Sequence, residues 1–264
     1  MPCINAQDRS FTLGHGLFET MFVNQGDIPA FSYHWERLNA SAPKIDIKLP
    51  FSQNQLKTFI NEVVEENDLA HQAIGVRVTV SHGEAPRGIW PSAIPAANFV
   101  ISAFPLEQRV DNPFKAFIVA IPKNEKALSA SIKSTSYLDN ILAKREAINN
   151  GFDEAILLNG AGFVADGAIS NIFMVKCGEI VTPSIEDGAL PGIIRSILIQ
   201  ELGHKYPILE RSITKAELLE ADEVFVTNAL LGVQPVRQIN DRLFSSLNLA
   251  QKIGDDLRTQ KNYI

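Results

Sequence analysis

Lys133 is the residue of this chain whose surroundings first suggest covalent chemistry. It opens the stretch KSTSYLDN, after the apolar, strand-like run FKAFIVAIP (Phe114 to Pro122) and before a helical pattern of Leu138, Ile141, Leu142 and Ile148. A lysine amine is a useful covalent catalyst when its pKa is lowered and it is held against an electrophilic carbonyl group. A solvated surface charge is the plain alternative, so the interpretation depends on what else the chain carries.

Three other features suit a cofactor that carries both an aldehyde and a phosphate group. Gly192, in LPGIIRSILIQEL, opens a predicted helix, and the free amide groups and positive dipole end of a helix start attract phosphate. Arg37, in YHWERL, has a planar fork of donors that suits bidentate phosphate binding. Asp166, in VADGAISNIF, is a carboxylate that could keep a pyridine nitrogen protonated. Taken singly, they are also explained as an ordinary helix start, a surface arginine and an Asp-Gly turn.

The first half of the chain is predicted to hold strands around a turn, then a helix and two further strands. FTLGHGLFETMFV and DIPAF flank the turn at residues 24–26. A capping box at Ser52 and Gln55 starts a helix with one apolar face. Strands at residues 75–81 and 98–104 border a long loop rich in Gly and Pro, and such loops often carry function.

The polar stretch PLEQRVDNP marks the predicted domain boundary. We expect a small N-terminal α+β domain at residues 1–106, a linker at 107–113 and a larger domain at 114–264. In the larger domain a second capping box lies at Thr214 and Glu217. Its predicted strands are 116–121, 154–158, 172–175, 179–182 and 223–227, and its predicted helices are near 138–150, 193–203, 215–220 and 245–258. Both halves mix helices and strands, which indicates the α+β class.

Composition excludes several classes of function. With 264 residues, 45% of them apolar and 20% charged, the chain is typical of a globular enzyme. The net charge of -6 and the pI near 5.4 give no basic field for nucleic acid or an anionic membrane. Cys3 and Cys177 have no His or Cys partner at metal-ligand spacing, so no metal site is expected. The sequence contains no signal-peptide or bilayer-spanning pattern, which favours the cytoplasm.

Read together, the motifs resemble those of the fold-type IV pyridoxal 5'-phosphate (PLP) enzymes. This family comprises D-amino-acid aminotransferases, branched-chain aminotransferases and aminodeoxychorismate lyases. The resemblance runs from about Asp8 to Arg237 and implies a small α/β sandwich domain, a larger domain with a barrel-like sheet and helices, and a homodimer. The motifs are, in chain order, DRSFTLGHGLFET, the HxxRL motif that contains Arg37, KSTSYLDN, VADGAISNIF, LPGIIR and FVTNALLGVQPV.

The resemblance also implies roles for individual residues. Lys133 matches the lysine that binds the cofactor covalently and later shuttles a proton. Asp166 takes the place of the family's glutamate opposite the pyridine nitrogen and is one methylene shorter. The residues that match phosphate contacts are Arg37, Ile193 and Ile194 through their backbone amides, and Thr227 through its hydroxyl. Ile194 stands where the family usually has Thr and lacks that hydroxyl.

The substrate loop and the segment after Thr227 favour one reaction over the others. The D-amino-acid enzymes use an Arg-x-His pair to bind the substrate carboxylate, whereas here Arg87 is followed by Gly88 and Ile89. TNALLGVQPV, with Asn228 beside Thr227, is most similar to the lyase pattern. We therefore expect a 4-amino-4-deoxychorismate lyase with Arg87 and Asn228 as substrate-binding residues, and an aminotransferase of D-amino acids or branched-chain amino acids is the alternative.

Further expectations concern partners and the remaining polar residues. The substrate is a small molecule, and in the expected homodimer the first domain's loop reaches the partner's site, so that Arg87 acts in trans. A PLP carrier without activity is the alternative from outside the enzymes. His15 and His82 lie near glycines and are expected to be structural rather than catalytic acids.

Overall fold

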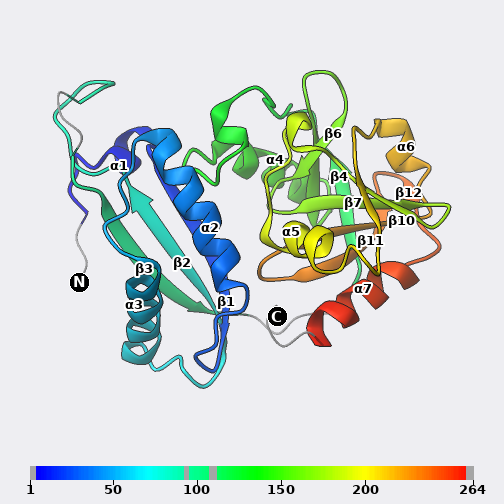
Figure 1. The fold of residues 1–264 in the computed structure, drawn as a ribbon. Helices are drawn as coiled ribbons and strands as arrows, with labels where there is room; N and C mark the ends of the chain where they lie inside the picture. The colour runs from blue at the N-terminus through cyan, green and yellow to red at the C-terminus, as the bar shows by residue number, and fades with distance from the viewer. Residues whose placement is uncertain (1–3, 92–94, 107–111, 260–264) are drawn as a thin grey trace. The chain divides into compact units, whose positions relative to one another are not determined.

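The computed structural model describes residues 4–91, 95–106 and 112–259, and the chain groups into two units (Figure 1). The first unit contains Met1–Gln108 and Ile132–Tyr137, and the second contains Arg109–Ser131 and Leu138–Ile264. The segment around Lys133 therefore packs with the first unit although the chain on both sides of it belongs to the second. The greater part of the predicted linker, residues 107–111, lies outside the described residues, as does Cys3.

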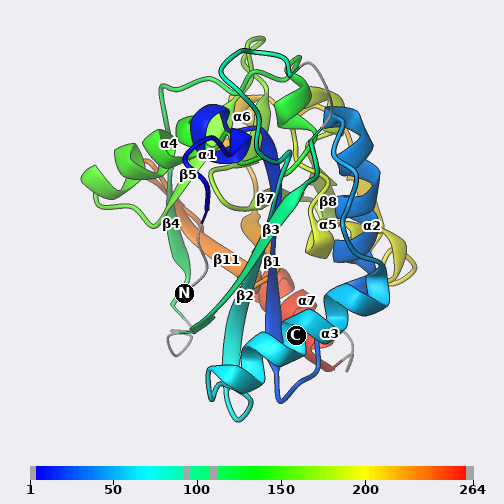
Figure 2. The same cartoon turned by 90° about the vertical axis from the view of Figure 1, so that its left-hand side faces the viewer.

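The first unit is built on a three-stranded antiparallel sheet with strand order β1-β2-β3. Along β2 the side chains of Ile74, Val76, Val78 and Val80 are fully buried, which is the alternation of a strand with one face on a core. Helices α2 and α3 supply the other side of that core (Figure 2). The bounds are β1 Gly16–Asn24, β2 Ala73–Ser81, β3 Asn98–Pro105, α1 Arg9–Leu13, α2 Phe31–Ser41, α3 Gln53–Glu66 and a 3₁₀ turn at Ala42–Ile45.

The predicted pairing of two strands around the turn at residues 24–26 is wrong in part. The segment FTL belongs to α1, because Asp8 caps that helix by accepting from the backbone N–H groups of Ser10 and Phe11. DIPAF is not a strand either, since α2 begins at Phe31. Strand β1 pairs instead with β2, far along the chain, in register from Gly16 to Asn24.

The second unit contains a nine-stranded mixed sheet with the order β6-β5-β4-β11-β10-β7-β8-β9 and β12 beside β11. The sheet curls so that β6 also approaches β7, which confirms the expected barrel-like sheet. The strands are β4 Phe114–Ile118, β5 Glu154–Leu158, β6 Val164–Gly167, β7 Asn171–Lys176, β8 Glu179–Thr182, β9 Ile208–Glu210, β10 Glu223–Asn228, β11 Gly232–Ile239 and β12 Arg242–Leu243.

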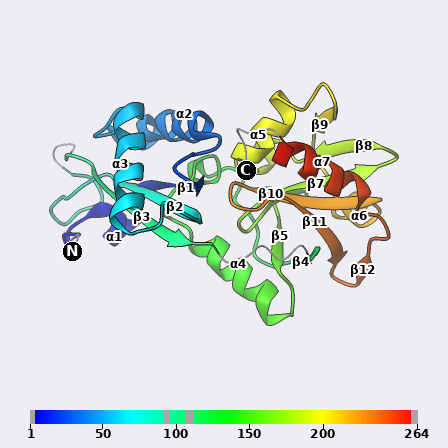
Figure 3. The ribbon, with the colours of Figure 1, turned by 90° about the horizontal axis from the view of Figure 1, so that it is seen from below.

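Helices accompany this sheet, and among them α7 lies against β10 and β11 (Figure 3). Their bounds are α4 Leu138–Asn149, α5 Ile193–Gln200, α6 Lys215–Leu219 and α7 Asn248–Thr259, with 3₁₀ turns at Leu128–Ala130 and Ile185–Asp187. The predicted α+β class is confirmed. Helix α4 presents its larger apolar side chains outward: Leu138, Ile141 and Ile148 are exposed, while Ala143 and Ala147 are buried.

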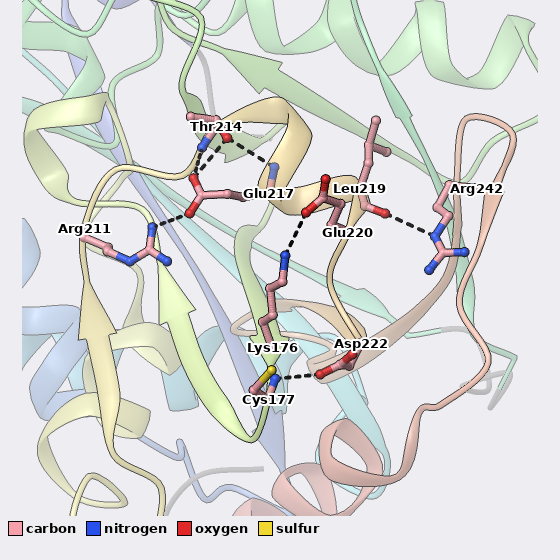
Figure 4. A network of polar contacts seen from close by, with 9 residues as sticks. All are labelled: Lys176, Cys177, Arg211, Thr214, Glu217, Leu219, Glu220, Asp222 and Arg242. Atoms are coloured by element: carbon pink, nitrogen blue, oxygen red, sulfur yellow. Dashed lines mark hydrogen bonds and ion pairs between the residues drawn. The ribbon is translucent and has the colours of Figure 1, made fainter.

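Both predicted capping boxes are present. At α3 the Ser52 hydroxyl accepts from the Gln55 backbone N–H, and the Gln55 side chain accepts from the Ser52 backbone N–H. At α6 Thr214 and Glu217 exchange the same pair of bonds, and Arg211 adds an ion pair to Glu217 at 3.0 Å (Figure 4). These local bonds fix where the two helices begin.

Candidate functional site

Glu19 is the centre of a buried polar cluster in the first unit. It lies on β1, and His34 and Arg37 reach it from α2, where their spacing of three residues places them on one face. The Arg37 guanidinium donates through Nε to Glu19 Oε1 at 2.8 Å and through NH2 to Oε2 at 2.6 Å. His34 Nδ1 lies 2.7 Å from Glu19 Oε2. The pairing of Arg37 with Glu19 is bidentate and almost fully buried.

The charges of this cluster are set by its members. Burial by itself would raise the pKa of Glu19, but the Arg37 charge and the hydrogen bonds from His34 and Arg37 lower it to about 2. Burial lowers the pKa of His34, and the nearby charges of Arg37 and Lys133 lower it further against the bond to Glu19. Glu19 is therefore ionised and His34 neutral at pH 7. One edge of the Arg37 guanidinium is held by Glu19, and its predicted phosphate contact stays a prediction.

Lys133 lies in a short segment that pairs with β1. The Phe18 N–H donates to the Lys133 carbonyl at 2.9 Å, and the Thr135 N–H donates to the Gly16 carbonyl at 2.9 Å. The Nζ atom of the half-buried lysine lies 4.4 Å from the centroid of the Phe18 ring and 5.3 Å from that of Tyr137. Aromatic faces at this range attract a cation and exclude water beside it. Lys133 and Arg37 thus both belong to the first unit.

Asp166 lies in the second unit, inside β6. Its carboxylate is buried and accepts from Asn171 Nδ2 at Oδ1, at 3.0 Å, and from the Leu190 backbone N–H at Oδ2, at 2.9 Å. Burial raises its pKa to about 7, against the lowering effects of Lys123 and of these two hydrogen bonds. Such a carboxylate changes its charge readily when a partner arrives.

The start of α5 lies directly against this carboxylate's partner. Gly192 is the N-cap residue, and a Cβ placed on it would lie 1.8 Å from Asn171 Oδ1, so only glycine fits. Ile193 and Ile194 are buried in the first turn. The first four N–H groups of a helix have no acceptor inside it, which makes this turn a donor set for an anion.

Thr227 lies near these residues within the second unit. It lies on β10 directly opposite Asn171 of β7, so both side chains share one face of the sheet. Thr227 is 1% exposed, and within the described part of the chain its Oγ1 has no hydrogen-bond partner. Buried hydroxyls are normally paired. The orphaned hydroxyl, the glycine helix start and the buried carboxylate fit a ligand that carries a phosphate and a ring nitrogen.

The two predicted substrate residues lie in different units. Arg87 is exposed on the loop after β2, and Arg9 holds that loop by donating to the carbonyls of Gly88, at 3.1 Å, and Ile89, at 2.5 Å. Asn228 follows Thr227, and its Oδ1 accepts from two backbone N–H groups of the following turn, at 3.0 and 2.8 Å. Asn228 therefore shapes its own turn. Substrate binding by either residue stays a prediction.

His15 and His82 form a stacked pair with ring centroids 4.0 Å apart. His15 Nδ1 accepts from Arg9 Nε at 3.3 Å, and its Nε2 then donates to the Ile45 carbonyl at 2.9 Å. His82 is buried. These contacts indicate a structural role for His15, beside the loop that Arg9 binds.

Three residues of these clusters are not predicted from the sequence: Glu19, His34 and Asn171. Each lies in a quoted motif, in LFET, YHWERL and SNIF, yet its function depends on a partner from another element. The i, i+3 spacing of His34 and Arg37 was the available signal for a shared acceptor. No such spacing links Asn171 to its neighbours.

Neither a metal cluster nor a membrane span is found in the described residues. Over residues 4–91, 95–106 and 112–259, no three His, Cys, Asp or Glu side chains gather in a way that would hold a metal ion. No helix in those ranges has the length and apolar character needed to cross a bilayer.

Comparison with known proteins gives one family. The sequence profile of the family Amino-transferase class IV matches residues 16–239. A D-alanine aminotransferase of Bacillus licheniformis is 30% identical over 246 residues, covering 92% of this chain and 85% of the relative. These matches extend over most of the chain.

Solved structures agree with the sequence comparison. A Legionella pneumophila structure, provisionally named 4-amino-4-deoxychorismate lyase, has a TM-score of 0.92 at 30% identity and covers 98% of this chain and 96% of its own. A branched-chain aminotransferase of the archaeon Thermoproteus uzoniensis, solved with norvaline, has a TM-score of 0.90 at 29% identity, covering 97% and 88%. Both lyases and aminotransferases are thus similar to this chain.

Proposed function

This chain belongs to the class IV aminotransferase family of PLP-dependent enzymes, and from that premise we propose that it is a lyase that converts 4-amino-4-deoxychorismate to p-aminobenzoate and pyruvate, a step in folate precursor synthesis. The observation that carries the choice is the loop after β2. Arg87 is exposed there, and the position two residues later is Ile89, which cannot donate to a carboxylate as histidine does. The loop thus offers one cation instead of the Arg-x-His pair.

The proposed cofactor contacts are residues of both units. In this proposal Lys133 binds PLP covalently, and Asp166 faces the pyridine nitrogen. Bound PLP supplies an electron-withdrawing ring that stores electrons released at the substrate carbon. The proposed phosphate contacts are Arg37, Ile193, Ile194 and Thr227, and the proposed substrate contacts are Arg87 and Asn228.

The reaction then needs one base and no amino acceptor. The Lys133 amine would be the base that removes the proton from the amine-bearing carbon of the substrate. The bond between the substrate's six-membered carbon ring and the enolpyruvyl oxygen breaks, and this carbon ring becomes aromatic. The enolpyruvyl group takes up a proton to become pyruvate. Aromatisation drives the step, and the cofactor is unchanged at the end.

Aminotransfer is the second candidate because the D-alanine aminotransferase is as similar in sequence as the provisionally named lyase, at 30% identity. An aminotransferase would pass the substrate's amino group to the cofactor and would need a keto acid to complete the cycle. Its substrates would be D-amino acids or branched-chain amino acids.

The deciding experiment mixes the protein with PLP and 4-amino-4-deoxychorismate without a keto acid. Equal amounts of pyruvate and p-aminobenzoate, lost in Lys133→Ala, support the lyase. If neither product forms while the protein still shows the visible absorption of lysine-bound cofactor, the lyase assignment is wrong. If an amino acid alone then changed this absorption to that of the pyridoxamine form of the cofactor, the protein would be an aminotransferase.

A homodimer is part of the same proposal. The exposed aliphatic row on α4, Leu138, Ile141 and Ile148, has the character of a surface that a second copy covers. Trp90 and Ile89, next to Arg87, are also exposed, at 62% and 82%. We propose that the loop carrying Arg87 reaches the partner's site, and we place the enzyme in the cytoplasm.

A further inference from the structure

We propose that Asn171 is a positioning residue that holds the Asp166 carboxylate at a fixed spacing from the start of α5. The consequence for the cofactor rests on the proposed function, in which Asp166 meets the ring nitrogen and α5 meets the phosphate. The contacts themselves are those of the second unit alone.

The first support is a closed ring of hydrogen bonds. An asparagine amide has two N–H donors. Asn171 Nδ2 donates to Asp166 Oδ1 at 3.0 Å and to the Leu190 carbonyl at 2.7 Å. The Leu190 N–H in turn donates to Asp166 Oδ2 at 2.9 Å. Asn171 therefore orients Oδ1 directly, and it also binds Leu190, whose N–H orients Oδ2.

The second support is the packing on the other side of the same amide. Leu190 lies two residues before Gly192, and the Asn171 Oδ1 atom occupies the space that a Cβ on Gly192 would need. The start of α5 is thus seated directly on Asn171. Across the sheet, the neighbour of Asn171 is Thr227, whose buried hydroxyl lacks a partner in the described chain. The Asn171 side chain thereby contacts Asp166 and the residues before α5, and it adjoins Thr227.

The third support is electrostatic. Asp166 is buried, and the charges that act on it are the more distant Lys123 and Arg195, since its direct partners Asn171 and Leu190 are neutral. Its pKa is about 7 even with those partners. Removing the Asn171 donor should raise the pKa further, because a hydrogen bond to the charged form is lost. At neutral pH the carboxyl would then be protonated and could not keep a ring nitrogen protonated.

The test uses the apoprotein, so that it does not depend on the reaction. Aspartate carboxyl carbons are labelled with ¹³C, the Asp166 signal is assigned by its loss in Asp166→Asn, and its midpoint is followed with pH. In Asn171→Ala and in the similarly sized Asn171→Leu, which has no donor and adds no charge, we expect the midpoint to rise by about one pH unit or more. Asn159→Ala is the matched control, because Asn159 is a buried asparagine that donates to Asp187; it should leave Asp166 unchanged.

A second measurement connects the contact to the cofactor. PLP is titrated into each apoprotein, and we expect at least about tenfold weaker binding in both Asn171 variants at a pH of about 7.5, with part of the loss recovered above the raised midpoint, where Asp166 is ionised again. An unmoved Asp166 midpoint in both variants would overturn the proposal. Failure of the lyase reaction would not, because the midpoint is measured without substrate or cofactor. If Asn171→Ala does not fold, Asn171→Leu carries the same test.

Discussion

Glu19 and Asp166 are two buried carboxylates in opposite electrostatic surroundings. Glu19 is in direct bidentate contact with Arg37, and its pKa falls to about 2. Asp166 has only neutral hydrogen-bond partners, and its pKa rises to about 7. Burial penalises the charged form in both, so the difference comes from the adjacent Arg37 guanidinium and, with it, the hydrogen bond from His34. Glu19 is suited to fixing structure, whereas Asp166 is suited to responding to a ligand.

Glu19→Gln should lower the free energy of unfolding by about 3 to 5 kcal/mol, because it leaves the Arg37 charge largely buried without its counter-charge. Chemical denaturation monitored by circular dichroism measures this. Glu220→Gln is the control, since Glu220 pairs with Lys176 at 2.8 Å on the surface (Figure 4) and its loss should change little. If both substitutions lowered the free energy of unfolding by the same amount, burial would not explain the importance of the Glu19–Arg37 pair.

The raised pKa of Asp166 predicts that the folding stability of the apoprotein depends on pH. Its folded-state pKa of about 7 lies above the ordinary value of 3.8, so the folded protein holds a proton that the unfolded chain releases. Its contribution to stability is complete below pH 3.8 and is lost as the pH rises to about 7. Asp166→Asn should flatten this part of the profile in thermal unfolding measured from a pH of about 4 to about 8. An identical slope in both proteins would refute the assignment.

At the level of elements, two glycines show how the same residue type has different tasks. Gly192 begins α5 where a side chain would collide with Asn171, whereas Gly254 lies within α7 with ordinary space around it. A Cβ on Gly254 would lie 3.6 Å from the Cβ of Val233. The first glycine is required by packing, and the second only lowers helix propensity.

Gly254→Ala should therefore raise the free energy of unfolding by about 0.5 to 1 kcal/mol, since alanine favours helix and loses less entropy on folding. Gly192→Ala should lower it and weaken PLP binding, because α5 must move away from Asn171. Differential scanning calorimetry and a PLP titration of both variants test the pair. A stabilised Gly192→Ala would show that the close contact is easily relieved.

Local signals predicted most elements, and long-range pairing explains the errors. Ser52 and Thr214 cap their helices through bonds to residues three positions away, so the starts of both helices can be predicted from the sequence. DIPAF looked like a strand because it follows a turn, but β1 finds its partner in β2. Asn171 and Glu19 escaped notice for the same reason, since their partners come from other elements. The site residues Lys133, Arg37, Asp166 and Thr227 were found through motifs, and their assigned roles remain to be tested.

At the scale of the whole molecule, the residues proposed to bind the cofactor are divided between the two units. Arg37 and Lys133 belong to the first, and Asp166, Ile193 and Thr227 belong to the second. The proposed homodimer adds Arg87 from the partner copy, so that a complete site would need two chains.

Mixing two inactive variants tests that arrangement. If Arg87 acts in trans, exchanged dimers of Lys133→Ala and Arg87→Ala contain one intact site, and the mixture should recover about one quarter of the wild-type activity. If Arg87 acts within its own chain, no intact site forms and no activity returns. Light scattering establishes the dimer beforehand, and lyase assays before and after subunit exchange measure the recovery.

The path of the chain around Lys133 bears on protein engineering. Residues 132–137 pack with β1, although Ser131 and Leu138 on either side of them belong to the second unit. A chimaera that exchanges only residues 1–108 with a relative would join a foreign β1 to the original lysine segment. Recombination between relatives should therefore transfer residues 132–137 together with residues 1–108, as two separate segments that require three crossovers in the gene.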